Sequence, residues 1–314
     1  MKSIDSKILN NFIKVSERAA FGASKYRGKN DKIAADQAAV DEMRNMLNKI
    51  NMKGKIVIGE GEMDEAPMLY INESVGTNEG LSLDIAVDPL EGTNFAANNL
   101  PGALSMMSIS EKNNLFNAPE TYMEKISTRV TEKNVIDLDY SVKKNISNLS
   151  DYLNKNPENI TACILDRPRH VKIIDELKRM KVKLKLISDG DVSGALLVTE
   201  NRHNVDIFLG IGGGPEGVLA ASALDTFGCS FQGRFLFETD EDKSRAKKMG
   251  INDLKKKYEL NEIVSGDSIF CATGITSGDL VSGIEIQGNE FISETLVTHK
   301  SSGLKKVIKQ KQNI

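Results

Sequence analysis

The stretch LSLDIAVDPLEGT, residues 81–93, decides the fold and locates the chemistry of this chain. Residues 81–87 have the character of a buried strand, and the proline that follows them stops the strand ladder because it has no N–H to donate. A glycine near the end of the stretch permits a tight turn. The segment therefore presents the carboxylates of Asp88 and Glu91 and the hydroxyl of Thr93 within one turn.

Two carboxylates beside such a turn form a ligand set that suits a hard divalent cation. Mg²⁺ and Mn²⁺ prefer carboxylate and carbonyl oxygens, and the main-chain carbonyl of Leu90 could add a further ligand. The alternative is a helix that begins with acidic residues near the positive end of its dipole. These residues alone leave both interpretations open.

A second acidic cluster, GEGEMDE at residues 59–65, directly follows a predicted strand. It includes Glu60 and Asp64, and like charges so close together repel one another unless cations or solvent compensate them. The alternative is a solvated loop. Asp36 lies on an earlier predicted helix, where its small and mainly apolar neighbours favour an inward-facing side chain.

The glycine-rich segment GIGGGPEG, residues 210–217, lies between a predicted strand and a predicted helix. Backbone amides at such a helix start can bind phosphate, and the glycine spacing formally matches the dinucleotide-binding fingerprint. However, Pro215 removes an amide donor, and Glu216 would place a negative charge beside a pyrophosphate. Glu216 is therefore interpreted as a metal ligand, and close packing of helix on sheet is the alternative role of the glycines.

Two further segments follow predicted strands and carry groups that suit a phosphorylated sugar. Arg167 and Arg169 at a helix start can grip a phosphate through bidentate hydrogen bonds, although surface arginines are common. The sequence SDGD at 188–191 can hydrogen-bond sugar hydroxyls or simply cap the next helix. Tyr122 lies in a segment without regular periodicity, and a ligand contact there has no other support.

Hydrophobic periodicity predicts an α/β protein whose chemically important segments lie at strand ends. Strands are predicted at 55–58, 81–87, 103–110, 160–165, 183–187, 205–209 and 268–271. Helices are predicted at 8–21, 33–50, 65–75, 149–155, 168–180, 192–199 and 215–227. Residues 113–139 look irregular. We predict an N-terminal α+β metal-binding half over residues 1–145 and a C-terminal α/β substrate-binding half over 146–314.

Composition excludes several classes of partner. The 314 residues carry a net charge of −3 and 5% aromatic residues without tryptophan, which argues against nucleic-acid binding. No apolar stretch is long enough for a membrane span or a signal peptide. Cys163, Cys229 and Cys271 are scattered, which indicates reduced, buried thiols in a cytoplasmic protein. The lysine-rich run at 305–311 is predicted to be a solvated tail.

Seven segments match one known family in its own order. They are AADQAAV (34–40), IVIGEGEMDEAPMLY (56–70), DIAVDPLEGT (84–93), NAPETYMEK (117–125), SDGD (188–191), GIGGGPEGV (210–218) and FCATGITSGDL (270–280). The chain resembles the class II fructose-1,6-bisphosphatases of bacteria, members of the lithium-sensitive phosphatase superfamily. The string at 56–70 is highly specific, whereas DPxEGT is characteristic of the wider superfamily.

The resemblance implies a layered α/β/α/β/α sandwich, a homo-oligomer (dimer or tetramer), and metal-dependent hydrolysis of the 1-phosphate of fructose 1,6-bisphosphate in gluconeogenesis. It implies Mg²⁺ or Mn²⁺ held by Asp36, Glu60, Asp88, Glu91 and Glu216. Thr93 would orient the attacking water, with Asp64 as its partner. The implied substrate contacts are Glu91, Gly92, Thr93, Tyr122, Arg167, Pro168, Arg169, Asp189, Gly190, Asp191 and Gly213.

The chain departs from the family pattern at a few positions, and other functions stay open. Asn94 stands where an arginine is often found, Arg167 stands where a lysine often leads, and the C-terminus is shorter than in many members. Alternative substrates are sedoheptulose bisphosphate and an inositol phosphate. A dinucleotide-binding regulator and an inactive sugar-phosphate sensor are the alternatives outside catalysis.

Overall fold

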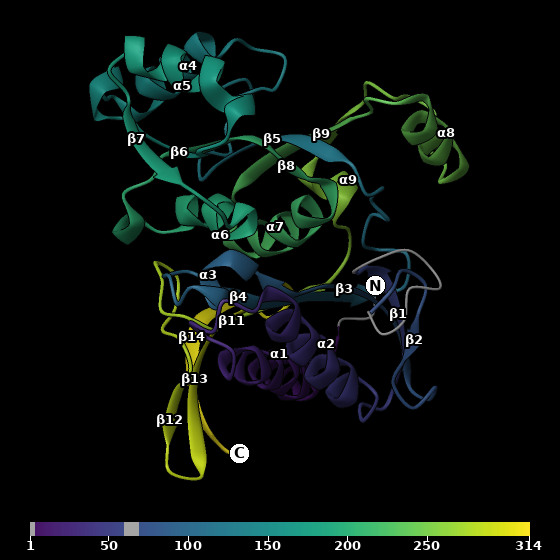
Figure 1. The fold of residues 1–314 in the computed structure, drawn as a ribbon. Coiled ribbons are helices and arrows are strands. Elements are labelled where there is room, and N and C mark those ends of the chain that lie inside the picture. The colour runs from purple at the N-terminus through teal and green to yellow at the C-terminus, as the bar shows by residue number, and fades with distance from the viewer. Residues whose placement is uncertain (1–3, 60–68) are drawn as a thin grey trace. The chain divides into compact units, whose positions relative to one another are not determined.

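The computed structural model describes residues 4–59 and 69–314, which form two compact units (Figure 1). The first unit combines Met1–Asn117 with Val264–Ile314, and the second is Ala118–Ile263. The predicted boundary at 145 and 146 falls within a helix of the second unit. The division into a metal-binding and a substrate-binding half stays a prediction.

The described residues of the first unit form an eight-stranded mixed sheet with the order β12-β13-β11-β4-β3-β1-β2, and β14 pairs with β13. Only β1 and β3 are parallel among these described pairs. The strands are β1 (Met52–Ile58), β2 (Ser74–Val75), β3 (Leu81–Glu91), β4 (Leu104–Glu111), β11 (Ser268–Gly274), β12 (Glu285–Gln287), β13 (Glu290–His299) and β14 (Leu304–Asn313).

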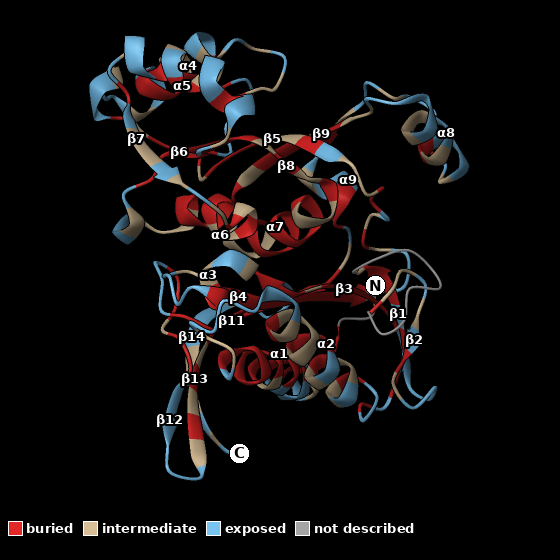
Figure 2. Ribbon diagram, in the orientation of Figure 1, coloured by how far each residue is buried: buried red, intermediate tan, exposed pale blue. Residues whose placement is uncertain are grey.

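Helices α1 (Leu9–Ser24) and α2 (Lys32–Leu47) pack on this sheet, and α3 (Thr93–Ala97) follows β3 directly. Asp31 starts α2 because its side chain accepts a hydrogen bond from the Ala34 amide at 2.9 Å. The apolar residues of α1, including Phe12, are buried against β3, β4, β11 and β13 (Figure 2). This helix–sheet interface is the core of the first unit.

The second unit is built on a six-stranded mixed sheet with the order β10-β9-β5-β8-β6-β7 among its described strands. Strands β6, β7 and β8 are parallel, whereas β5 is antiparallel to β8 and β9. The strands are β5 (Tyr122–Thr128), β6 (Thr161–Leu165), β7 (Lys183–Ile187), β8 (Ile207–Gly213), β9 (Ser230–Leu236) and β10 (Lys257–Glu259).

Helices cover both faces of this second sheet (Figure 1). On one face, Ile146 and Leu177 from two helices pack with Ile126 and Leu209 of the sheet. Helices α6 and α7 contact β5, β6 and β8 from the opposite face. The helices are α4 (Val142–Leu153), α5 (Val171–Arg179), α6 (Asp191–Leu196), α7 (Gly214–Phe227), α8 (Asp240–Lys248) and α9 (Leu260–Ile263). The predicted α/β class is thereby confirmed.

The predicted helix at 65–75 is wrong in its described part. Asn72 adopts a left-handed conformation with φ of 76°, and Ser74 and Val75 form β2. The Ile56 amide donates to the Glu73 carbonyl at 2.9 Å, and the Asn72 amide donates to the Ile56 carbonyl at 2.8 Å. Residues 72–75 therefore hydrogen-bond to the edge of β1, and this pairing outweighs the helical pattern of the sequence.

Two other segments are more regular than predicted. Residues 113–139 include β5, which lies in the middle of its sheet, between β8 and β9. The predicted solvated tail at 305–311 is wrong, because it lies within β14, which pairs with β13 along its length. Leu304 and Ile308 pack against the core of the first unit while the lysines stay exposed. The basic composition concealed this strand-like alternation.

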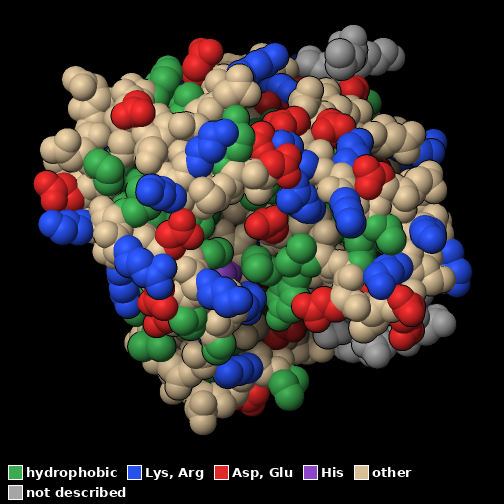
Figure 3. Space-filling view, turned by 90° about the horizontal axis from the view of Figure 1, so that it is seen from above, with side chains coloured by type: hydrophobic (Ala, Val, Ile, Leu, Met, Phe, Trp, Pro, Cys, Tyr) green, Lys and Arg blue, Asp and Glu red, His purple; other side chains and the backbone are tan. Residues whose placement is uncertain are grey.

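Several expectations from composition can be compared directly with the structure. All three cysteines are free thiols and are buried, as predicted. None of the helices in the described ranges combines the length and the apolar character that crossing a membrane requires. On the face shown in Figure 3, Lys and Arg side chains are interspersed with Asp and Glu side chains, in keeping with the net charge of −3.

Candidate functional site

A bulge in β3 sets the direction of two predicted metal ligands. Asp88 lies opposite Met106 of β4 and Glu91 lies opposite Leu104, so three residue steps on β3 match two steps on β4. Residues two apart on a strand share a face, and residues paired across two strands do as well. The extra residue therefore brings Asp88 and Glu91 to the same face, whereas a regular strand would send them to opposite faces.

The chain turns sharply immediately after Glu91. Gly92 has φ of 77° and caps α3, and its carbonyl accepts hydrogen bonds from the amides of Phe95 at 2.8 Å and Ala96 at 3.1 Å. Glycine adopts this left-handed conformation without a steric penalty. Thr93, half-buried, is the first residue of α3. Thr93 thus follows the two carboxylates closely in the sequence and belongs to the same unit.

The helix that carries Asp36 lies beside this turn. Helix α2 contacts both β3 and α3. The loop before it is tied to α3, because the Gly28 amide donates to the Ala96 carbonyl at 3.0 Å and the Asn30 amide donates to the Ala97 carbonyl at 2.8 Å. Asp36 itself is half-buried in α2. The elements that carry three predicted ligands are therefore neighbours in the first unit.

The two described residues on either side of the acidic segment, Gly59 and Leu69, lie close together at the end of β1. Strand β1 runs parallel to β3, with Ile58 opposite Ala86, and Gly59 follows it. A Cβ atom on Gly59 would lie 2.0 Å from the Leu69 carbonyl oxygen, so the two ends of the segment are in close contact. Glu60 and Asp64 lie between these ends, outside the described residues.

The metal cage remains a prediction. Across residues 4–59 and 69–314, no three His, Cys, Asp or Glu side chains lie close enough together to hold a metal ion. Of the five predicted ligands, Glu60 is outside these ranges and Glu216 belongs to the second unit. The three others supply only carboxylate oxygens, a donor set that fits Mg²⁺ or Mn²⁺ rather than a soft metal.

In the second unit, the predicted substrate contacts gather at one edge of the six-stranded sheet. Strands β6, β7 and β8 are parallel, so their carboxyl ends share that edge. Tyr122 begins the antiparallel β5 and pairs with Gly213, the last residue of β8. The other predicted contacts follow these strand ends, namely Arg167, Pro168 and Arg169 after β6 and Asp189, Gly190 and Asp191 after β7. The predicted metal ligand Glu216 follows β8.

The two arginines at this edge make different contacts. The Nε of Arg169 donates to the Ile211 carbonyl at 2.9 Å, and its guanidinium lies 4.9 Å from the centre of the Tyr122 ring. This cation–π contact orients both side chains. One terminal nitrogen of Arg167 is 3.8 Å from Oδ1 of Asp189. Arg167 is partly exposed and Arg169 is exposed.

His170, which the sequence reasoning missed, holds two of these strand ends together. Its ring is fully buried, with Nδ1 2.7 Å from the Leu165 carbonyl oxygen, and the Ile211 amide donates to Nε2 at 2.7 Å. Burial lowers the pKa of His170, which keeps the ring neutral. The neutral ring with its proton on Nδ1 satisfies both contacts. The only sequence signal was its place directly after the arginines.

The glycine-rich segment makes room for acidic side chains. A Cβ atom on Gly212 would lie 2.1 Å from Oδ2 of Asp191, and one on Gly213 would lie 1.9 Å from Oε2 of Glu216. Any side chain at these positions would therefore displace a carboxylate. Side chains of the predicted site, rather than a helix packed on the sheet, therefore occupy the space beside Gly212 and Gly213. The alternative of close helix–sheet packing applies to Gly217, where an added Cβ would lie 2.5 Å from Sδ of Met123 in β5.

The environment of Glu216 opposes its ionisation. It lies in the first turn of α7, half-buried at the surface of the unit. Burial raises the pKa of this carboxyl, the positive charge of Lys125 lowers it, and the negative charge of Asp191 raises it again. Lys125 and the helix N-terminus both favour the charged form. A cation bound at Glu216 would act in the same direction.

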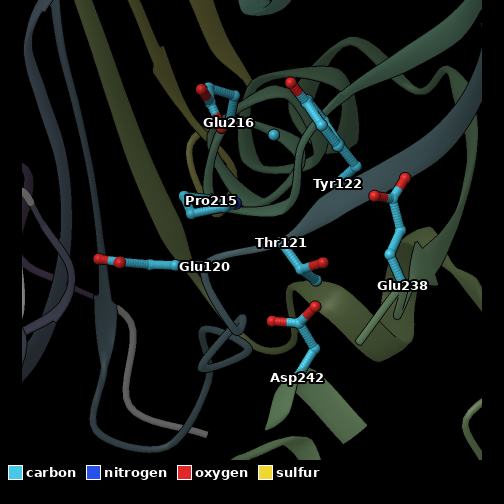
Figure 4. Close-up of a pocket in the computed structure, with 8 residues that line it drawn as sticks. Glu120, Thr121, Tyr122, Pro215, Glu216, Glu238 and Asp242 are labelled. Atoms are coloured by element: carbon cyan, nitrogen blue, oxygen red, sulfur yellow. The ribbon is translucent and has the colours of Figure 1, made fainter. Parts of the chain in front are cut away.

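A cavity of about 430 Å³ opens beside Tyr122 and Glu216 (Figure 4). This volume falls in the range of sites for small molecules. In Figure 4, Glu238 and Asp242 form a wall on the other side of Thr121 from Glu216. The lining residues are Glu120, Thr121, Tyr122, Gly213, Pro215, Glu216, Glu238 and Asp242. The sequence did not indicate Glu238 and Asp242 as site residues, because they belong to a polar segment around the start of α8.

These features define a class of protein. One unit carries carboxylates of the kind that bind divalent cations, and the other carries arginines and hydrogen-bond acceptors at the ends of parallel strands. A metal-dependent phosphatase of the α/β type uses such groups. Residues 6–312 match the family model described as bacterial fructose-1,6-bisphosphatase, glpX-encoded. The chain belongs to this family, as the sequence predicted.

Relatives with assigned names agree with the family. The chain is 40% identical over 324 residues to the D-fructose 1,6-bisphosphatase class 2/sedoheptulose 1,7-bisphosphatase of Synechococcus sp. (strain JA-3-3Ab), covering 95% of this chain and 93% of the relative. It is 38% identical to the protein of the same name from Trichodesmium erythraeum (strain IMS101), covering 95% and 94%. The extragenic suppressor protein suhB of Bartonella henselae is a distant structural match, with 10% identity and a TM-score of 0.36 over 63% of this chain and 74% of that one.

Proposed function

We propose that this chain is a metal-dependent fructose-1,6-bisphosphatase that hydrolyses the 1-phosphate ester and releases fructose 6-phosphate and phosphate in gluconeogenesis. Membership of the family supports the activity. The observation that carries the chemistry is the bulge in β3, which turns Asp88 and Glu91 to one face beside Thr93.

The proposed metal ligands are Asp36, Glu60, Asp88, Glu91 and Glu216, and the proposed metal is Mg²⁺ or Mn²⁺. Bound divalent cations supply charge that stabilises the transferring phosphoryl group and lowers the pKa of water. The protein contributes an oxygen-only ligand set on a rigid strand and helix.

The remaining proposed roles are positioning roles, which suit a phosphoryl transfer that asks little covalent work of the protein. The Thr93 hydroxyl orients the attacking water, with Asp64 as its partner. Arg167 and Arg169 bind the phosphate that is not transferred, a role supported by their partial or full exposure after the end of β6. Asp189 and Asp191 accept hydrogen bonds from sugar hydroxyls, and Tyr122, Pro168, Gly190 and Gly213 shape the pocket.

The deciding experiment measures phosphate release from fructose 1,6-bisphosphate with Mg²⁺, with Mn²⁺ and with excess EDTA. We expect turnover with at least one of the two cations and none with EDTA. No turnover with either cation would overturn the proposal. Sedoheptulose 1,7-bisphosphate is the second candidate substrate, because the names of the relatives include it. Phosphate release from inositol 1-phosphate tests the other alternative substrate, and we expect none.

The proposal extends to assembly and location. We infer a homo-oligomer, either a dimer or a tetramer, that acts in the cytoplasm. Light scattering coupled to size-exclusion chromatography would give the mass, and a value near the 34.4 kDa of one chain would contradict an oligomer. Fractionation of the source cells would test the location.

A further inference from the structure

Lys125 is a buried cation within the sheet of the second unit. Its side chain is 1% exposed, and it lies in β5 opposite Gly210 of β8 and Gly233 of β9. Two positions along the strand, the Ser127 hydroxyl donates to the Ala195 carbonyl of α6 at 3.4 Å. Residues two apart share a face, so Lys125 points to the face that α6 and α7 cover. A Cβ atom on Gly217 of α7 would lie 3.3 Å from its Cε, so its aliphatic stem packs on that helix.

The amine of Lys125 holds one oxygen of a predicted substrate contact. Its Nζ donates to Oδ2 of Asp191, the first residue of α6. The side chain of Asp191 is 10% exposed. The absence of a side chain on Gly212 makes room for that carboxylate. The other oxygen, Oδ1, is buried and has no hydrogen-bond partner among the residues that the structure describes. The carboxylate is thus fixed at one oxygen and unsatisfied at the other.

An ordinary structural ion pair does not account for this arrangement. Buried charged pairs contribute to stability only when their remaining hydrogen-bonding capacity is satisfied, and an apolar pair often stabilises the fold as well or better. The amine also lies near the first turns of α6 and α7, where the helix dipoles disfavour a cation. The burial of the Lys125 amine is unfavourable, and Oδ1 of Asp191 is left without a hydrogen-bond donor among the described residues. Together these two features indicate that a ligand completes the site.

We propose that Lys125 is a positioning residue for the sugar. It anchors Asp191 through Oδ2 and leaves Oδ1 oriented to accept a hydrogen bond from a substrate hydroxyl group. This inference rests on the proposed function, in which Asp191 contacts the sugar. Lys125 itself does not touch the substrate, so its effect on the reaction passes through Asp191.

A double-mutant cycle tests this assignment. The variants are Lys125→Met, which keeps the stem and removes the charge, Asp191→Asn, and the double variant, all assayed on fructose 1,6-bisphosphate with saturating metal. We expect each single substitution to raise KM about tenfold or more, with a smaller change in kcat, since loss of a hydrogen bond to a charged group has this size. The double variant should match Asp191→Asn within a factor of about three, because both changes remove the same contact.

Ser127→Ala is the matched control, because it removes a buried polar group from the same face of the same strand. Its KM should equal that of the wild type even if its unfolding temperature falls. A Lys125→Met variant that keeps the wild-type KM would overturn the inference, and so would single effects that multiply in the double variant. Should Lys125→Met fail to fold, Lys125→Gln, which retains a donor without the charge, takes its place in the cycle.

The outcome also separates this inference from the proposed function. A wild-type chain that releases no phosphate would contradict the proposed function and, with it, the inference. An active wild type whose Lys125 variants bind substrate normally sinks only the inference. Metal titration of each variant shows whether any loss arises at Glu216 instead, since that loss would disappear at high metal concentration.

Discussion

The backbone of β3 is distorted to direct its carboxylates, whereas the backbone at the start of α7 is regular and its glycines make space for theirs. Asp88 and Glu91 share a face through a bulge, and the following Gly92 has φ of 77°. Gly213, in contrast, has an ordinary φ of −67° and is a glycine because the Glu216 carboxylate lies over it. Glycine is therefore needed in the first unit because the backbone is left-handed, and in the second unit because a neighbouring carboxylate occupies the space of a Cβ atom. We call the second kind a clearance position.

This difference changes how glycines beside acidic residues are interpreted from sequence. At a left-handed position, asparagine is a tolerable replacement, whereas at a clearance position every side chain is excluded. The chain itself illustrates the first rule, since eight of the nine described non-glycine residues with positive φ are asparagines. The following variants test whether the two mechanisms are as distinct as the geometry indicates.

The largest effect is expected when a carboxylate is removed from the bulge. Asp88→Asn should lower kcat about a thousandfold, because it removes charge at the point where phosphoryl transfer needs it most. It should also abolish the rise in unfolding temperature that Mn²⁺ causes in the wild type. Asp84→Asn is the matched control, since Asp84 is buried on the same strand and accepts a hydrogen bond from the Asn113 amide at 2.7 Å. A retained metal response in Asp88→Asn would contradict the assigned role.

Filling a clearance position should have the next largest effect. Gly212→Ala would place a Cβ atom 2.1 Å from the Asp191 carboxylate, and a displacement of about 1 Å at a substrate contact costs about a hundredfold in kcat/KM. Gly228→Ala is the contrast, because φ there is 70° and, apart from its chain neighbours, none of the described residues comes within 4 Å of its added Cβ. It should cost about 1 kcal/mol of stability and leave kcat/KM unchanged. Equal kinetic effects of the two variants would refute the distinction.

At Gly92 the conformation should matter more than the added volume. Gly92→Ala must adopt a left-handed conformation, which costs about 1–2 kcal/mol, and we expect kcat to fall about tenfold through misplacement of Thr93. Gly92→Asn should retain more activity, since asparagine tolerates this conformation. The comparison needs kcat values and urea unfolding curves for both variants. An asparagine variant as impaired as the alanine variant would indicate that clearance from Phe95, 2.9 Å from the added Cβ, dominates instead.

The smallest effect on turnover is expected at Glu17, a buried carboxylate of α1 that accepts a hydrogen bond from Ser293 and one from Gln312. Burial raises the pKa of Glu17 from 4.5 to about 7. The folded chain therefore holds a proton that the unfolded chain releases between pH 4.5 and 7, and stability falls across this window by about 3 kcal/mol. Glu17→Gln should remove that fall and leave kcat unchanged. Urea unfolding at pH 5 and pH 8 tests this, and a variant as pH-sensitive as the wild type would disprove it.

The sequence predicted the strands that precede the candidate site residues better than it predicted the surroundings of those residues. Periodicity located β3, β6, β7 and β8, so the segments after them were correctly assigned to strand ends. It missed β5, β13 and β14, because their burial depends on partners far away in the chain. It also missed Lys125 and His170, whose importance lies in contacts with α6 and Ile211 that no local pattern encodes. The bulge in β3 follows from pairing with β4 and likewise has no local signature.

The discontinuous first unit has a consequence for synthesis of the chain. Strand β11 lies between β4 and β13, yet it is made only after the whole of Ala118–Ile263. The edge of β4 that pairs with β11 therefore stays unpaired during roughly ten seconds of translation, while the second unit can already fold. An exposed edge is a template for pairing with other chains. The growing polypeptide is thus most vulnerable to aggregation on the ribosome at the edge of β4 that later pairs with β11, and release of its last strands ends that period.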